Sequence, residues 1–128
     1  MQVAARFADR LNVIASPEKC TEVLRDFEAI CAAAGRECDE IEFSLHTTLA
    51  LSERPEGAEA YAVDVAASHG VELEALRDTW IIGDVDGAIR CLQRYLDAGI
   101  SHFVFAVGQP FDLGPLQLFR ERVLPSLS

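Results

Sequence analysis

The stretch His102-Phe103-Val104-Phe105-Ala106-Val107 carries the clearest strand signal in the chain. It is a nearly continuous apolar run, which is typical of a strand covered on both faces of a parallel sheet. Two earlier strands are expected. An apolar stretch over 3–8, continuing into 9–14, is predicted to hold one strand and its exit, and the β-branched and aromatic segment 41–51 is predicted to form the other.

Helical patterns alternate with these strands. Ser16 and Pro17 are typical of a helix start, and Gly35 of a helix end. Between them, apolar residues recur at helical spacing, at Cys20, Val23, Leu24, Phe27, Ile30, Cys31 and Ala34. Further amphipathic helices are predicted over 88–96 and 115–124. The alternation predicts right-handed βαβ crossovers and therefore an α/β fold with a parallel sheet.

The segment 52–80 is predicted to be a helical insertion between a strand and the next βα unit, within a single domain spanning residues 1–128. A sheet of about three parallel strands is small. Both of its faces must be covered, and the predicted helices are expected to cover only one side well. Either another molecule covers the second face, or the strands belong to a larger closed barrel.

The charge balance excludes several function classes. The 128 residues carry 21 acidic and 11 basic side chains, for a net charge of −10. This argues against binding to nucleic acid or to anionic lipid, because both need a basic surface. Half of the residues are hydrophobic, so a disordered acidic tail is also excluded. No apolar run approaches the roughly 20 residues that span a bilayer.

The start of the sequence shows no secretory signal, so a cytoplasmic location is expected. Four cysteines stand at Cys20, Cys31, Cys38 and Cys91, and none forms a C-x-x-C pair. Buried free thiols in a reducing compartment are favoured over disulfides.

Four segments, in order along the chain, resemble motifs of one protein family. They are 7–12 (FADRLN), 31–36 (CAAAGR), 82–87 (IGDVDG) leading to 95–104 (YLDAGISHFV), and 118–125 (LFRERVLP). Together they are similar to the C-terminal portion of the luciferase-like monooxygenases. These (β/α)8-barrel oxidoreductases use FMN or the deazaflavin F420.

The resemblance implies a partial (β/α)8 barrel made of C-terminal βα units. In the family, earlier strands supply most of the substrate pocket and the catalytic acid or base, so no catalytic residue is assigned in this chain. Arg10 and Leu11 also stand where the family has Gly-Trp.

Three residues are cofactor-binding candidates, because active sites of such barrels lie at the carboxyl ends of the strands. Asn12 could bond a flavin edge, or it could satisfy its own backbone in a turn. His46 could donate a proton near a reduced flavin, or it could be a half-buried strand histidine. Gly108 would permit close approach of a cofactor, or it could serve a simple turn. No metal-binding or nucleophile motif is present in the sequence.

These observations lead to two alternative hypotheses about function, which belong to different classes. The first is a truncated or split luciferase-like oxidoreductase that is inactive alone and needs its missing N-terminal half. The second is a non-catalytic module in which copies of a half barrel pack their uncovered sheet faces together as a homo-oligomer.

Overall fold

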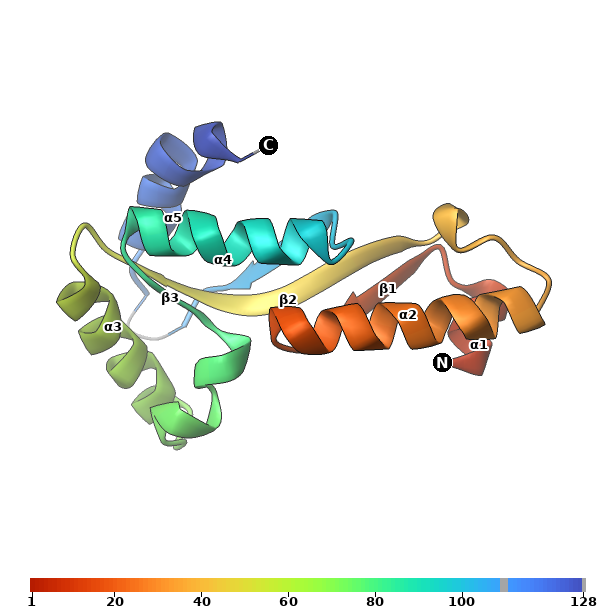
Figure 1. Ribbon diagram of the computed structural model, residues 1–128. Coiled ribbons are helices and arrows are strands. Elements are labelled where there is room, and N and C mark those ends of the chain that lie inside the picture. The colour runs from red at the N-terminus through yellow and green to blue at the C-terminus, as the bar shows by residue number, and fades with distance from the viewer. Residues whose placement is uncertain (109–110, 128) are drawn as a thin grey trace. The chain divides into compact units, whose positions relative to one another are not determined.

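The computed structural model describes residues 1–108 and 111–127 (Figure 1). It is a mixed α/β structure in which helices and strands alternate, as predicted. The strands are β1 (Arg10–Val13), β2 (Glu42–Leu51), β3 (Ile81–Gly83) and β4 (His102–Ala106). The helices are α1 (Gln2–Phe7), α2 (Pro17–Ala33), α3 (Pro55–Ser68), α4 (Val85–Asp97) and α5 (Gly114–Leu118). None of the described helices is both long and apolar enough to cross a membrane.

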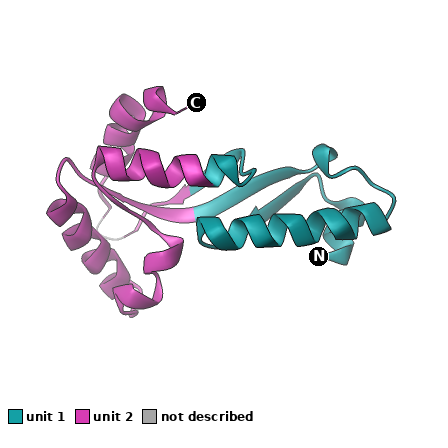
Figure 2. Ribbon diagram, viewed as in Figure 1, with its two compact units in different colours: residues 1–46, 95–104 teal, residues 47–94, 105–128 magenta. Residues whose placement is uncertain are grey.

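The chain divides into two compact units (Figure 2). Unit 1 comprises residues 1–46 and 95–104, and unit 2 comprises residues 47–94 and 105–128. The ladders of β1, β3 and β4 all pair with β2. Each unit is described below by itself.

The β1–β2 pair of unit 1 is parallel, as predicted. Arg10 of β1 lies opposite Glu42 of β2, and the register continues to Val13 opposite Leu45. The Glu42 N–H donates to the Asp9 carbonyl at 3.0 Å, which fixes the start of this ladder.

Helix α2 covers one face of this strand pair. The Ser16 hydroxyl caps it by accepting the Lys19 N–H at 3.3 Å, and Pro17 occupies its first turn. Phe27 and Cys31 are fully buried in a cluster with Ala5 and Ile41. The Phe27 ring also meets Phe43 of β2 edge-on, with ring centroids 5.8 Å apart. The apolar stripe predicted from the sequence is therefore the core of unit 1.

The prediction of a strand within 3–8 is wrong, because residues 2–7 form helix α1. Its Ala5 is fully buried against α2, whereas Val3 and Phe7 are 73% and 78% exposed. In a strand, residues 3, 5 and 7 would lie on the same face and would be buried or exposed together. The observed burial differs, because Ala5 is buried and its two neighbours on that face are not. Only Arg10–Val13 of the predicted segment is extended.

Unit 2 contains a strand that the sequence analysis missed. Strand β3 lies parallel to the end of β2, with Leu49 opposite Ile81 and Leu51 opposite Gly83. Helix α3 packs over this region, where Ala62 and Ala66 form a buried cluster with Ala50 and Leu73. The Thr47 hydroxyl donates to the Thr79 carbonyl at 2.7 Å and ties the approach to β3 onto β2.

The expectation that the chain's own helices cover only one sheet face is wrong for unit 2. All five consecutive residues from 47 to 51 are buried, and successive strand residues point to opposite faces. Helix α3, placed in the predicted insertion, supplies this second layer. The expectation of burial on both faces also fails for β4, where Val104 remains 43% exposed and the other residues are half-buried.

Tyr95 offers a test of the unit 1 packing. It is 1% exposed, and its hydroxyl donates to the Ala15 carbonyl at 2.8 Å. We expect Tyr95→Phe to lower the free energy of unfolding by about 1 kcal/mol, because the ring still packs but the buried carbonyl loses its donor. Urea unfolding measures the change. A free energy of unfolding equal to that of the unaltered chain would contradict the assignment.

Candidate functional site

Asn12 lies within strand β1 and not in a turn. Its side chain is exposed, and its Oδ1 accepts a hydrogen bond from the Ser44 hydroxyl at 2.9 Å. Ser44 lies directly opposite Asn12 in the ladder and is only 1% exposed. Because Oδ1 is used by Ser44, the amide N–H2 is the part of Asn12 that can donate to a ligand.

His46 is half-buried and lies in the middle of β2, five residues before the strand ends at Leu51. The two-residue period of a strand places His46 on the same face as Ser44. The structure therefore brings Asn12 and His46 onto one face of the β1–β2 pair. Leu11 and Phe43 lie on the opposite face, where they pack against the α2 cluster.

Gly108 belongs to unit 2. It is buried, and a Cβ atom placed on it would lie 2.2 Å from Cγ1 of Val65. Val65 is a fully buried residue of α3. Packing against α3 thus leaves no room for a side chain at position 108. The sequence alone did not indicate this reason for the glycine.

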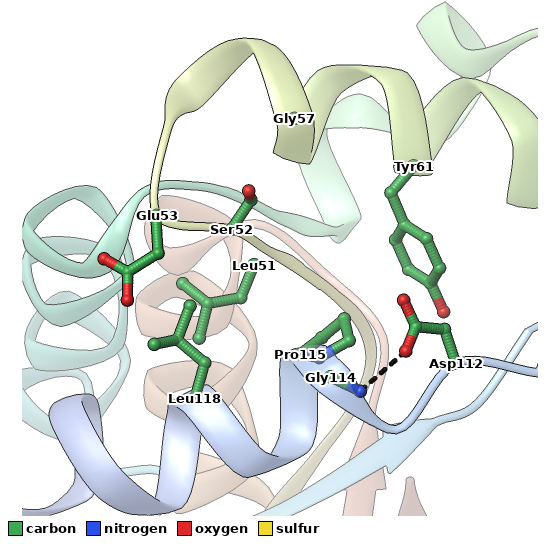
Figure 3. Close-up of a pocket in the computed structure, with 9 residues that line it drawn as sticks. All are labelled: Leu51, Ser52, Glu53, Gly57, Tyr61, Asp112, Gly114, Pro115 and Leu118. Atoms are coloured by element: carbon green, nitrogen blue, oxygen red, sulfur yellow. Dashed lines mark hydrogen bonds between the residues drawn. The ribbon is translucent and has the colours of Figure 1, made fainter.

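A pocket that the sequence analysis did not anticipate lies at the carboxyl end of β2, within unit 2 (Figure 3). Its volume is about 340 Å³. Residues from the end of β2, from α3 and from the start of α5 line it, namely Leu51, Ser52, Glu53, Gly57, Tyr61, Asp112, Gly114, Pro115 and Leu118. The carboxyl ends of parallel strands are where α/β barrels place their active sites.

The polar lining of the pocket is acidic. Asp112 accepts the Gly114 N–H at 2.8 Å, and the Tyr61 ring points toward the Asp112 carboxylate (Figure 3). The pKa of the Tyr61 phenol is raised mainly by partial burial and, to a smaller extent, by the negative charge of Asp112. Arg122 approaches Glu53 at 3.6 Å. The pocket therefore holds Tyr61 as a neutral hydrogen-bond donor beside a carboxylate.

Solved structures resemble this chain along almost its whole length. An F420-dependent tetrahydromethanopterin reductase from Methanopyrus kandleri matches 99% of the chain with 21% identity and a TM-score of 0.72. An F420-dependent secondary alcohol dehydrogenase matches 99% with 18% identity and a TM-score of 0.76. The oxygenating constituent of 3,6-diketocamphane monooxygenase from Pseudomonas putida, solved with FMN, matches 99% with 11% identity and a TM-score of 0.67.

The fold is that of part of these enzymes. The chain spans 48%, 45% and 45% of their respective lengths, in keeping with a partial TIM barrel. The predicted resemblance to luciferase-like oxidoreductases is confirmed at the level of the fold. No family model and no curated protein matches the sequence.

FMN and F420 both carry phosphate, which proteins bind through Arg, Lys or clustered backbone N–H groups. The described residues that line the pocket include two carboxylates, Glu53 and Asp112, and no basic side chain. This pocket therefore does not fit the phosphate end of either cofactor. The Asn12–His46 face offers an amide and an imidazole, which can hydrogen-bond the edge of a ring.

The sequence analysis missed the pocket residues because they belong to no motif. The one clue in the sequence was that Ser52 and Glu53 directly follow the predicted strand 41–51, where a barrel places its active site. Tyr61 and Asp112 lie 51 residues apart in the sequence, and only the packing of α3 beside the segment before α5 brings them together.

Gly108 provides a test of the packing interpretation. We expect Gly108→Ala to lower the free energy of unfolding by about 1–3 kcal/mol, because the new methyl group overlaps a stiff β-branched side chain. The same substitution in a Val65→Ala background makes room for the methyl group and should cost clearly less. Equal costs in the two backgrounds, measured by urea unfolding, would show that Val65 is not the obstacle.

Tyr61 and Asp112 provide a test of the pocket electrostatics. Asp112→Asn removes a negative charge that disfavours the phenolate, so the pKa of Tyr61 should fall toward its ordinary value. Titration of tyrosinate absorbance at 295 nm measures the shift. The matched variant Asp39→Asn, on an exposed position of unit 1 that does not line the pocket, should leave the titration unchanged. An unaltered curve for Asp112→Asn would contradict the contact.

Proposed function

We propose that the chain is the C-terminal part of a luciferase-like, FMN- or F420-dependent (β/α)8 oxidoreductase, and that it is inactive without the remaining strands. The single observation that supports this is the match of nearly the whole chain to less than half of each F420- or FMN-linked neighbour. In this view residues 1–128 form one domain of the barrel, with 52–80 as its insertion. The cytoplasmic location expected from the sequence stays a prediction.

The face of β1 and β2 that carries Asn12 and His46 is proposed to face the barrel interior. Helices cover the outside of such barrels, and in unit 1 the helix-covered face is the opposite one, which bears Leu11 and Phe43. The proposal concerns only this first half of β2, because in unit 2 helix α3 packs against Ala50, which the two-residue period places on the His46 face. In the assembled barrel, the Asn12 amide would donate to the polar edge of the cofactor ring, and His46 would hold a proton beside it.

Incomplete coverage supports the need for a partner. Phe7 and Ile14 in unit 1 are 78% and 63% exposed, and Val104 of β4 is also exposed. Apolar surface of this kind is normally buried against another part of an assembly. The proposed partner is the missing N-terminal half. The same exposed residues favour the second candidate, a homo-oligomer of half barrels with no catalytic role.

The proposal predicts that the chain alone does not bind the cofactor. Fluorescence of FMN or F420, titrated with the purified chain to several hundred micromolar, should stay unquenched, because the described pocket lining offers no basic group for a phosphate. Saturable quenching at one equivalent would show that the chain is self-sufficient and would overturn this part of the proposal.

The genomic DNA distinguishes the two candidates. An in-frame upstream sequence that encodes further βα units is expected, and the longer polypeptide should bind FMN or F420. In that polypeptide, Asn12→Ala and His46→Ala should each weaken binding about tenfold, the cost of one good hydrogen bond. His69→Ala, at the end of α3, is the control. A stable oligomer of the chain by light scattering, with no such upstream sequence and no binding, would favour the homo-oligomer.

A further inference from the structure

Two cysteines that the sequence separates by seven positions meet in unit 1. Cys31 lies on the last turn of α2, and Cys38 begins the short 3-10 turn Cys38–Glu40 that leads into β2. The Cys38 thiol donates to Cys31 Sγ, with a sulfur–sulfur distance of 3.1 Å. All four cysteines of the chain are free, so this contact joins two reduced thiols.

The surroundings of the pair allow one sulfur to be reached from solvent. Cys38 is partly exposed, whereas Cys31 is fully buried in the cluster of Phe27 and Ile41. An oxidant can therefore reach the Cys38 sulfur from solvent, and Cys31 is in contact with that sulfur to act as the resolving cysteine. An accessible cysteine next to a resolving cysteine is one feature of redox-sensitive pairs.

The backbone between the two cysteines is able to adjust. A disulfide needs a sulfur–sulfur distance of about 2.0 Å, so the two sulfurs must approach by roughly 1 Å. The intervening segment contains Gly35 at φ +72°, with no atom within 4 Å of the position a Cβ would take. A small movement of this turn meets no packed neighbour at Gly35.

We propose that Cys31 and Cys38 form a reversible disulfide, a modification site that is independent of the proposed cofactor function. The oxidant is a low-molecular-weight disulfide. The Cys38 thiolate attacks one of its sulfurs and expels one small thiol, which takes up a proton. Cys31, after losing its proton, then attacks Cys38 Sγ, and the second small thiol leaves. Two cysteine thiols are oxidised, and one small disulfide is reduced to two thiols.

The other two cysteines serve as internal controls. Cys20 is fully buried on α2, and its thiol lies 3.9 Å from the Ala15 carbonyl. Cys91 is half-buried on α4. The described structure records a thiol–thiol contact for Cys31 and Cys38 and for neither of these two, so neither Cys20 nor Cys91 is expected to join a disulfide.

Burial, reinforced by the contact with Cys31, raises the pKa of Cys38 to about 12. Only a small fraction is then thiolate at neutral pH. Because the thiolate is the attacking species, the rate of oxidation should rise about tenfold for each pH unit between 7 and 9. The disulfide therefore forms slowly at neutral pH.

The test is performed on the whole folded chain with oxidised glutathione as the oxidant. The mass should fall by about 2 Da per chain, from the loss of two hydrogens, and dithiothreitol should restore it. Trypsin cleaves after Arg36, between the two cysteines, so the peptide 26–36 should remain joined to the peptide that begins at Glu37 until it is reduced. The oxidised chain should also melt at a higher temperature than the reduced chain.

Matched variants complete the experiment. Cys38→Ser should abolish the joined peptides and the rise in melting temperature, whereas Cys91→Ser should leave both unchanged. Because the decisive readout is the peptide linkage in the unaltered chain, it does not depend on how either variant folds. Linkage of Cys31 to Cys20 or Cys91, or no linkage at pH 9 after prolonged oxidation, would overturn the proposal.

Discussion

Strand β2 is the constraint on which the rest of the structure depends. It has ten residues, and the ladders of all three other strands pair with it. Its first residues hold β1 in register from Glu42 to Leu45, and its last residues hold β3 from Leu49 to Leu51. A one-residue slip would exchange the two faces. Leu45, buried in the present register, would leave the core, and His46 would turn toward it. The same strand thus sets both the packing and the placement of the candidate site residues.

Where sequence patterns were long, they predicted structure well. The Ser16-Pro17 start and the apolar spacing through Cys31 specify α2 because many positions agree. Short elements gave too little signal. Helix α1 has six residues, and β3 has three, so tertiary contacts of Ala5 and of Ile81 decide their conformation. Periodicity also could not show that α3 would cover the Ala50 side of β2.

The candidate site, like the fold, could be predicted only in part. The sequence placed Asn12 and His46 at the carboxyl ends of parallel strands, but it did not predict the register, with Asn12 opposite Ser44, that puts them on one face, and His46 lies in the middle of its strand. Gly108 looked equally suited to a ligand or a turn, and only the position of Val65 explains it. The acidic pocket at the end of β2 depends on Tyr61 and Asp112, whose proximity arises from helix packing that no local pattern encodes.

The bond from the Tyr95 hydroxyl to the Ala15 carbonyl joins residues 80 positions apart. Unit 1 is likewise discontinuous, since residues 95–104 complete what residues 1–46 begin. Residues 1–46 therefore cannot complete their packing until residues 95–104 are present. Contacts of such long range slow folding, because the intervening loop must be closed before they can form.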